Sequence, residues 1–556
     1  MIATGDSATS LLRSWRFAFW AVLLLSFALY ISTLSGRPVW DDNQILSGEG
    51  IGGGTLSGAI TQPFLHGYFR PLVALFLLFE NTLFHGSTFY YHLVNVLLHV
   101  AGCAVLIGLL LECFRSRKIA LLGGFFFAIH PVLVSTISWI GGITDCLGTL
   151  LVLLFAYTLV LSLRETPKKL LWSALSAVFF LLALFCKEQT IALILLVPLA
   201  AWAFDSQKKS LPLIVPYAAG AIFFLILWKI YFPGYPDITW GLTQRVQVIG
   251  QTLAYYVLIL FFPTGKWLQT YTLGSFASSI WVWTFLGFLF VAAFAFAWFR
   301  ILRADRGLAW FGAFLLLSIL PVANIIPPPS LVVAPYRAGL AVVGLAALFA
   351  IVLIKYVPKN IALGVGAVFS IWWLAMASTA IAPWLDQTSL FTTIVQVDPT
   401  FLQARENLAI TLMSSSQDQP PNPKEAATVL EGLLDQVFGS SAWRAPDGGA
   451  SIFQTDQKVQ AQVILNKGPM SGENWLSDVF NKLGEARARS GDIRGAITAF
   501  QGALGIRPTN FTSVASLAQL AMATGDKAAA RQYLDRANQL KPGDPGVAQM
   551  LQSLGK

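Results

Sequence analysis

Charged residues are scarce in this sequence. Lys, Arg, Asp and Glu make up 12% of its 556 residues, against roughly 25% in an ordinary soluble domain. Hydrophobic residues make up 56%, and the mean hydropathy is +0.65. This deficit of charge excludes an ordinary soluble globular protein and indicates a membrane protein. The apolar character runs from about Trp15 to Leu385 and then stops, so the chain has a membrane part followed by a soluble part.

Cysteine is also rare, and several catalytic motifs are missing. The four cysteines, Cys103, Cys113, Cys146 and Cys186, lie in or beside apolar runs and lack zinc spacing, which argues against a disulfide framework or a zinc finger. The sequence has no dinucleotide fingerprint, phosphate-binding loop or HExxH motif, and no nucleophile elbow in context. These absences argue against ATP-driven and zinc-protease functions.

The basic residues give a net charge of +9 and form short clusters between the apolar runs. Clusters of this kind face the cytoplasm, so we predict contact with membrane lipids and no nucleic-acid partner. The runs long enough to cross a membrane predict about eleven spans, at residues 15–35, 91–111, 119–135, 139–163, 170–185, 190–204, 211–232, 280–299, 307–326, 336–354 and 361–382. Two further runs, 72–84 and 246–262, predict interfacial or re-entrant helices on the outer face. The first run is predicted to be an uncleaved span with a cytoplasmic N-terminus, which places the C-terminus outside.

The predicted fold class is all-α. Residues 1–385 form a polytopic membrane helical bundle, in which residues 37–86 are the first extracytoplasmic loop with its interfacial helix. Residues 386–556 form an extracytoplasmic tetratricopeptide-repeat domain with clear repeats at 477–510 and 511–544. The same slots recur about 34 residues apart, as Leu483, Gly484, Gly491, Ala496, Phe500, Ala503 and Pro508, and then as Leu517, Ala518, Gly525, Ala530, Leu534, Ala537 and Pro542. A degenerate earlier unit is predicted within residues 397–434.

Two adjacent carboxylates, Asp41 and Asp42, follow the first predicted span in the sequence Trp40-Asp41-Asp42-Asn43. A carboxylate there can act as the general base on an acceptor hydroxyl, which is the catalytic role we predict for the pair. A loop turn or helix cap is the structural alternative. A divalent cation is another ligand that the two carboxylates would suit, although the sequence predicts no metal site and no required cofactor.

Three cations are predicted to bind a phosphate at the outer face: Arg70, Lys187 and Arg337. Anchoring to lipid headgroups is the alternative for the two arginines, and a pair with the adjacent Glu188 is the alternative for Lys187.

Other polar residues of the same face are predicted to line a substrate cavity, because charges at membrane depth are costly and usually functional. They are His66, His130, Asp145 and Glu188. A histidine satisfied within the bundle is the alternative for His130. His92, Asn95 and His99 share one helix face at a spacing that a metal could use, but interhelical hydrogen bonding is the favoured interpretation.

The ordered motifs resemble those of the GT-C-fold glycosyltransferases that use polyprenyl-phosphate sugars. The nearest branch is the transmembrane and tetratricopeptide-repeat protein O-mannosyltransferase family with its bacterial relatives. The motifs that carry the resemblance are Trp40-Asp41-Asp42, Phe69-Arg70-Pro71-Leu72, His92-Leu93-Val94-Asn95 with His99, Ala128-Ile129-His130-Pro131, Trp139-Ile140 with Asp145, Cys186-Lys187-Glu188, Leu320-Pro321-Val322 with Asn324, Trp384-Leu385-Asp386 with Ser389-Leu390-Phe391, and Asp398-Pro399. Two positions depart from the family pattern: Ser135 stands where a Glu is usual, and the Gly142-Ile143-Thr144-Asp145 stretch lacks the usual Arg.

The resemblance implies an inverting transfer without a nucleotide-sugar donor, at an outer-face site where an Asp of the first loop is the base. The function predicted is transfer of a mannose-like hexose from a polyprenyl-phosphate lipid to a hydroxyl acceptor, a Ser or Thr of an exported protein. The repeats would bind that protein or another partner. A non-catalytic membrane scaffold and a lipid-linked oligosaccharide ligase are the alternatives. The predicted location is a bacterial inner membrane, with the repeats in the periplasm.

Overall fold

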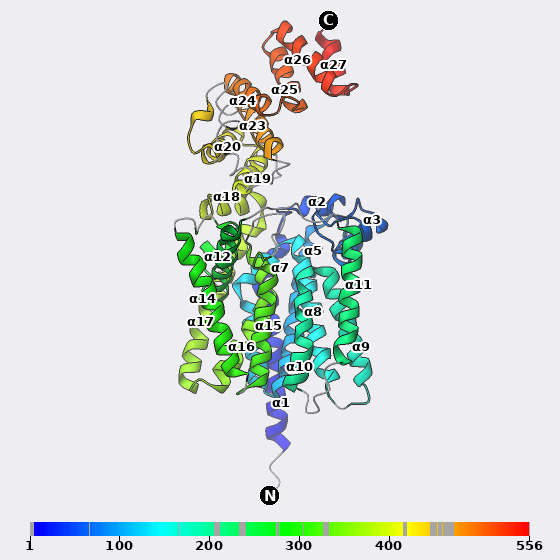
Figure 1. The fold of residues 1–556 in the computed structure, drawn as a ribbon, viewed down its shortest axis with the longest axis vertical. Helices are drawn as coiled ribbons and strands as arrows, with labels where there is room; N and C mark the ends of the chain where they lie inside the picture. Colours follow the sequence, from blue (N-terminus) through cyan, green and yellow to red (C-terminus); the bar gives the residue numbers. More distant parts are fainter. Residues whose placement is uncertain are drawn as a thin grey trace. The chain divides into compact units, whose positions relative to one another are not determined.

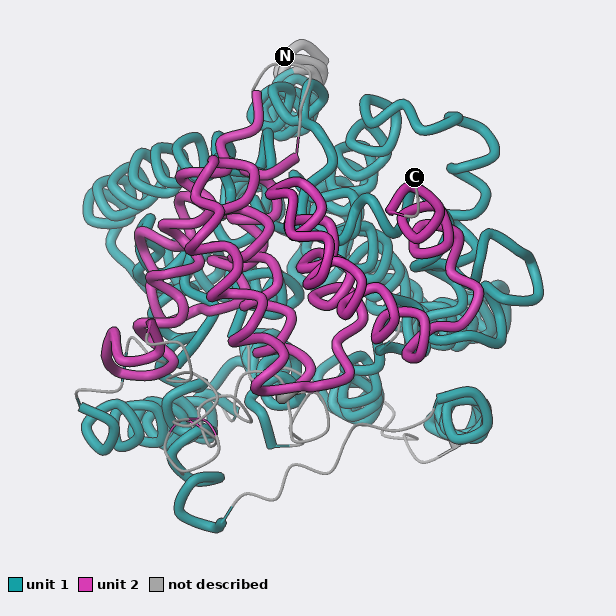
Figure 2. The backbone as a smooth tube through the Cα atoms, turned by 90° about the horizontal axis from the view of Figure 1, so that it is seen from above, with its two compact units in different colours: residues 1–390 teal, residues 391–556 magenta. Residues whose placement is uncertain are grey.

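The computed structural model describes residues 5–65, 67–164, 166–204, 212–232, 241–273, 276, 279–302, 304–325, 333–414, 420–444, 453, 459 and 472–554, with side chains of all of these except 5–13, 212 and 472–473. The described residues are helices and connecting loops, with one isolated β-bridge between Phe64 and Tyr68. They form two compact units, residues 1–390 and 391–556, which Figure 2 shows in different colours.

The first unit is a bundle of helices. Its first half contains α1 (Gly5–Leu29), α2 (Asp42–Leu46), α3 (Leu56–Thr61), α4 (Pro71–Phe84), α5 (Thr88–Phe114), α6 (Arg117–Ile129), α7 (Val134–Ile137), α8 (Ile143–Ser162), α9 (Lys169–Cys186) and α10 (Leu196–Phe204). Its second half contains α11 (Val215–Tyr231), α12 (Leu242–Phe261), α13 (Gly265–Leu268), α14 (Ile280–Ile301), α15 (Arg306–Ile319), α16 (Ala341–Lys355) and α17 (Lys359–Ile381). Helix α18 (Gln387–Val397) follows at the boundary between the units.

Each predicted span corresponds to helical structure, so the chain is a multi-pass membrane protein. Six helices are long and apolar enough to cross a bilayer, at Ser14–Ser35, Thr88–Phe114, Ile140–Ser162, Lys169–Cys186, Ile280–Ile301 and Lys359–Leu385. A seventh would be the bent pair Arg117–Ile129 and Pro131–Ile137. The other predicted spans form shorter apolar helices, at Glu188–Phe204, Val215–Tyr231, Arg306–Val322 and Ala341–Lys355.

The bend of 47° between α6 and α7 has a local cause. Pro131 has no backbone N–H and restricts the residue before it to extended conformations. His130 accordingly has φ −70° and ψ 124°, and α6 ends at Ile129. A short 3₁₀ turn (Pro131–Leu133) then leads into α7. The sequence predicted one continuous span here, and the break aims the α7–α8 corner at the cavity described below.

Burial separates central from peripheral helices within the bundle. In the span that contains α8, 78% of the apolar stretch consists of buried residues, whereas the share is 11% in each of the spans that contain α14 and α17. Figure 1 shows α14 and α17 along one edge of the unit and α9 and α11 along the opposite edge. Because their exposed residues are apolar, the outer helices match a lipid environment. In Figure 1 the short helices α2 and α3 lie at the end of the bundle that is opposite to the N-terminus.

The second unit is built of helix pairs. They are α19 (Leu402–Met413) with α20 (Pro423–Phe438), α23 (Gly472–Arg489) with α24 (Ile493–Ile506), and α25 (Phe511–Ala523) with α26 (Lys527–Leu540), followed by α27 (Pro545–Leu554). The last two pairs lie at the predicted clear repeats, and the first pair lies where the degenerate unit was predicted. The predicted class, an all-α membrane bundle followed by tetratricopeptide repeats, is therefore confirmed.

Equivalent residues make equivalent contacts in the two clear repeats. Asp492 caps α24 by accepting from the Gly495 amide, and Asp526, 34 residues later, caps α26 in the same way. The glycine before each cap has a positive φ, 88° at Gly491 and 81° at Gly525, which a residue with a side chain rarely adopts. Recurrence of both features fixes the repeat register.

Candidate active site

The first unit contains a cavity of about 670 Å³ at its loop-bearing end. Its polar lining consists of Asp41, Arg70, Thr144, Asp145, Lys187, Glu188, Gln189, Asn324 and Arg337. Its aromatic lining consists of Trp40, Phe64, Tyr68, Trp139, Phe224, Trp228 and Tyr336. The chain thus brings the loop after α1, the start of α4, the α7–α8 corner, the α9–α10 connection and the segment before α16 around one space.

Asp41 and Asp42 face different surroundings although they are adjacent. Asp41 lines the cavity, whereas Asp42 is fully buried and does not line it. The two Asp42 oxygens accept hydrogen bonds from the amides of Val39, at 2.9 Å, and Gly141, at 3.1 Å. Asp42 therefore ties the first loop to the α7–α8 corner, which leaves Asp41 as the carboxylate available to a substrate.

Burial changes the acidity of both carboxyl groups. It raises the pKa of Asp41 to about 6. It raises the pKa of Asp42 to about 8, against the opposing effect of the amides of Val39 and Gly141. A carboxyl whose pKa lies near neutrality is suited to accept a proton and release it again. Asp41 combines this acidity with access to the cavity.

Two of the cavity cations are paired with carboxylates from distant parts of the chain. Arg70 donates from Nε and Nη2 to the two oxygens of Glu188, at 3.3 and 3.1 Å, and its guanidinium lies 4.0 Å from the centre of the Tyr68 ring. Lys187 pairs with Asp145 at 2.5 Å, and both side chains are buried. Lys187 and Glu188, adjacent in sequence, thus bind other partners instead of each other.

Arg337 is the cavity cation that lacks a carboxylate partner among the residues described. It belongs to a short 3₁₀ helix (Pro335–Ala338) and is 8% exposed. Its neighbours include the uncharged hydroxyl-bearing rings of Tyr336 and Tyr256. Since Arg70 and Lys187 are each paired with a carboxylate, Arg337 is the cavity cation whose charge an anionic ligand could meet directly.

The remaining predicted residues lie elsewhere. His130 does not line this cavity, which disagrees with its prediction as a cavity residue. Its Nε2 lies 3.1 Å from the Leu260 carbonyl oxygen, its Nδ1 accepts from the Val132 amide, and its ring packs on Trp373 at 4.4 Å. The bend at Pro131 explains this placement, because it makes His130 the cap of the following turn. His66 lies outside the described residues.

Two residues of the predicted polar face of α5 make hydrogen-bonding contacts within the bundle. Asn95 donates from Nδ2 to the Trp139 carbonyl oxygen at 2.7 Å. His99 Nε2 lies 3.4 Å from the Ala128 carbonyl oxygen on α6. These interhelical contacts hold the turn that carries Trp139 and Gly141.

An aromatic wall closes one side of the cavity. Trp40 stacks on Trp384 with an angle of 11° between the rings, and it also packs against Tyr271 and Trp139. Trp139 in turn packs against Tyr336 at 5.6 Å. Trp40 has φ 56°, a left-handed conformation that is costly for a bulky residue and is concentrated at functional sites. The surrounding rings hold this strained residue directly before Asp41.

Sequence reasoning missed part of the lining. Tyr68, which supports the Arg70 guanidinium, carried no motif, although an aromatic ring two residues from a predicted phosphate ligand was a usable signal. Thr144 was noted only as part of a departure from a family pattern, yet it lines the cavity. Ser135, the other departure, is buried and does not line it.

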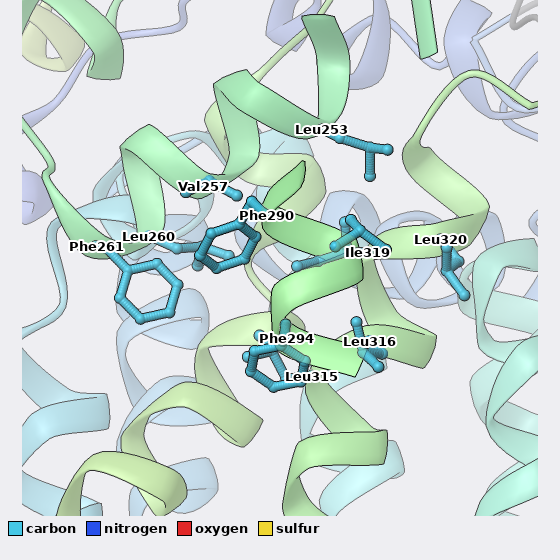
Figure 3. Close-up of a pocket in the computed structure, with 11 residues that line it drawn as sticks. Leu253, Val257, Leu260, Phe261, Phe290, Phe294, Leu315, Leu316, Ile319 and Leu320 are labelled. Atoms are coloured by element: carbon cyan, nitrogen blue, oxygen red, sulfur yellow. The ribbon is translucent and has the colours of Figure 1, made fainter. Parts of the chain in front are cut away.

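A second pocket of the first unit is lined by apolar side chains alone. It has a volume of about 20 Å³ and lies among α12, α14 and α15. Figure 3 shows it surrounded by leucines, isoleucine, valine and the rings of Phe261, Phe290 and Phe294. Because all of its lining side chains are apolar, it offers a substrate no hydrogen bond or charge.

Comparison with known proteins identifies one matching repeat family and several proteins of similar sequence. Residues 487–554 match a tetratricopeptide repeat family. The chain is 30% identical over 187 residues to the protein O-mannosyl-transferase Tmtc2 of Drosophila melanogaster, which covers 31% of this chain and 20% of that protein. It is 32% identical over 186 residues to Drosophila Tmtc1, covering 31% and 21%. It is 33% identical over 121 residues to TMTC1 of Mus musculus, covering 21% and 12%.

These matches confirm the resemblance to the transmembrane and tetratricopeptide-repeat protein O-mannosyltransferases. The alignments span about a fifth or less of the length of these relatives. Among solved structures, ArnT from Cupriavidus metallidurans bound to undecaprenyl phosphate aligns with a TM-score of 0.40 and 14% identity, over 91% of this chain and 80% of that one.

Proposed function

We propose that this protein is a membrane glycosyltransferase that moves a hexose from a polyprenyl-phosphate carrier to a hydroxyl acceptor, with inversion at the anomeric carbon. The observation that carries the proposal is the joint presence of Asp41 and the cations Arg70, Lys187 and Arg337 around one cavity. The names of the similar proteins support the choice of a sugar and of a Ser or Thr acceptor.

In the proposed reaction, Asp41 takes the proton of the acceptor hydroxyl. The hydroxyl oxygen forms a bond to the anomeric carbon from one face, while the bond from that carbon to the phosphate oxygen breaks on the other. The carrier changes from a phosphodiester with one negative charge to a phosphomonoester with two. Because Asp41 loses its negative charge in the same step, the total charge in the cavity is conserved.

The three cations would bind the phosphate at different stages of the reaction. Arg337, which has no carboxylate partner among the residues that the structure describes, suits the single charge of the bound donor. Lys187 and Arg70 are held in place by Asp145 and Glu188, and their remaining N–H donors are available to the second charge that develops on the leaving group. Cations fixed in advance cost no reorganisation when that charge appears.

The lipid and protein parts of the substrates need different surfaces. Phe224, Leu225 and Trp228 of α11 give the cavity an apolar side on which a polyprenyl chain could pack.

Asp42 would position the base through the bond of its carboxylate to the Gly141 amide. The helical repeats would bind the protein acceptor or a partner through their concave face. We place this active site on the outer, periplasmic side of a bacterial inner membrane.

Purified protein in proteoliposomes with a polyprenyl-phosphate mannose and a Ser/Thr peptide tests the proposal. Wild-type protein should glycosylate the peptide, and Asp41→Asn should reduce the rate by about 10²- to 10⁴-fold, the usual contribution of a general base. Unchanged transfer by Asp41→Asn would remove the assignment of the base. A folded wild-type protein without any transfer would favour the scaffold, and transfer only from a diphosphate-linked glycan would favour the oligosaccharide ligase.

A further inference from the structure

Three buried polar atoms beside the cavity lack hydrogen-bond partners among the described residues. They are Nε1 of Trp139, Oγ1 of Thr144 and Oε1 of Gln189. Each belongs to a residue that lines the cavity, and each residue is at least nine-tenths buried, with exposures of 8%, 3% and 6%. A buried polar atom without a partner costs about 1–3 kcal/mol, so native proteins satisfy nearly all of them. Three such atoms beside one cavity indicate that a ligand binds there and supplies the missing hydrogen bonds.

We propose that these three residues, with the faces of Trp40 and Tyr336, form the subsite for the hexose ring of the donor. This inference rests on the proposed function and adds to it the place where the sugar is recognised. The chemistry of the three atoms selects the occupant. The Trp139 N–H only donates, the Gln189 oxygen only accepts, and the Thr144 hydroxyl does both.

A sugar is the part of the donor that can satisfy this set. Phosphate oxygens without protons cannot donate to Gln189, and a polyprenyl chain can satisfy none of the three atoms. Each hydroxyl of a hexose both donates and accepts. The C–H groups of the ring also suit the negative faces of aromatic side chains, and Trp40, Trp139 and Tyr336 all line the cavity.

The chain positions of these residues place the sugar between the two halves of the reaction. Thr144 precedes Asp145, the partner of Lys187, and Gln189 follows Glu188, the partner of Arg70. The subsite therefore adjoins the cations proposed to hold the phosphate. On its other side, Trp40 immediately precedes Asp41. The hexose is the piece of the substrate that must bridge a phosphate and an acceptor base.

Close packing holds the Trp139 indole at this subsite. Gly141 lies under the indole so tightly that an added Cβ would come within 2.6 Å of the ring carbon Cζ2. The Trp139 carbonyl is held by Asn95 from α5. The indole is thus fixed by a glycine, which lies against the nitrogen-bearing edge of the ring, and by a hydrogen bond of its own backbone, while its N–H has no partner among the described residues.

Three variants remove the polar atoms: Thr144→Val and Gln189→Leu nearly keep the size of the side chain, and Trp139→Phe keeps an aromatic ring but a smaller one. Ser138→Ala is the matched control, because the Ser138 hydroxyl is equally buried and without a partner but does not line the cavity. Each variant is assayed for transfer from the polyprenyl-phosphate hexose and from donors that lack one sugar hydroxyl at a time. Binding of sugar-free polyprenyl phosphate is measured in parallel.

We expect each of the three variants to lose about 10- to 100-fold in kcat/KM for the complete sugar, as for a lost hydrogen bond in a buried site. For one deoxy donor, wild type and Thr144→Val should react equally, because the hydroxyl that Thr144 binds is already missing. Binding of sugar-free lipid should stay unchanged, and Ser138→Ala should behave as wild type.

Two outcomes would overturn the subsite while leaving the proposed function intact. One is an equal loss for every donor, with no deoxy donor that closes the gap. The other is a loss confined to the KM of the peptide, which would assign the atoms to the acceptor. If the wild-type protein transfers no sugar, the proposed function fails; binding of the sugar-lipid no tighter than that of the sugar-free lipid would then overturn the subsite as well.

Discussion

Removing the carboxylate of Asp145 should destabilise the membrane unit strongly. The side chains of Lys187 and Asp145 are only 9% and 5% exposed, so water is a poor replacement for the lost partner. Deleting one member of a buried ion pair costs about 3–5 kcal/mol, because the other charge stays buried without compensation. We therefore expect Asp145→Ala to lower the free energy of unfolding by about 4 kcal/mol.

A second ion pair of the same unit provides the control. Lys355 pairs with Asp305 at 2.7 Å, but its side chain is 36% exposed. Asp305 also accepts from the Tyr356 hydroxyl and the Leu308 amide, so it keeps partners when the lysine is removed. Exposed pairs of this kind contribute about 0–1 kcal/mol. Lys355→Ala should therefore unfold close to the wild type.

The cysteines offer an assay that reports on the membrane unit alone. Cys103, Cys146 and Cys186 are buried, Cys113 is partly buried, and all four are free and lie before residue 391. Thiol labelling of detergent-solubilised protein during a thermal or denaturant ramp therefore follows the opening of this unit and is insensitive to the repeats. Asp145→Ala should label at clearly milder conditions than Lys355→Ala.

A compensating double variant separates stability from function. Asp145→Leu with Lys187→Met replaces the buried pair by apolar side chains, an exchange that is often neutral or stabilising. The double variant should regain the protection of its thiols but not sugar transfer, because the cation is gone. The reasoning is refuted if Asp145→Ala labels like the wild type, or if the double variant is as unstable as the single one.

Two further predictions concern the carboxylates of the first loop. Asp41 must be ionised to accept a proton, and its pKa is raised to about 6, so the transfer rate should level off above about pH 7 and fall about tenfold per pH unit below about pH 6. Protonation of a group whose pKa is raised by folding does not destabilise the fold, so thiol protection should persist through this fall; a rate independent of pH from 5 to 8 would contradict Asp41 as the base. Asp42→Asn should lower stability by about 1–3 kcal/mol, because an amide has one oxygen for the two backbone donors of Val39 and Gly141. It should also slow transfer without moving the pH at which the rate falls, and a shifted pH profile would show that Asp42 itself exchanges the proton.

The spans and the repeats could be predicted from the sequence because long apolar runs mark the spans and recurring residues mark the repeats. Apolar runs bounded by basic residues correspond to helices, and the slots around Gly484 and Ala518 correspond to the paired repeat helices. The bend between α6 and α7 was missed because the apolar run continues through His130 and Pro131, although the proline itself was the local signal.

The cavity was harder to predict because its geometry depends on partners far along the chain. Arg70 and Glu188 are 118 residues apart, and Lys187 and Asp145 are 42 apart. Nothing local distinguishes these pairs from the adjacent Lys187 and Glu188. In the same way, the sequence could not separate Asp41 from Asp42, since the direction of each side chain depends on where α2 begins and on the amide of Gly141.

The hydrogen bond from the Gly141 amide to Asp42 has a consequence for how this site can tolerate motion. One short piece of chain, from Trp139 to Asp145, holds the first loop at one end and Lys187 at the other. This piece of chain sets the spacing between the two sides of the cavity. A displacement of α11 that admits a bulky lipid would therefore leave the spacing between Asp41 and Lys187 unchanged.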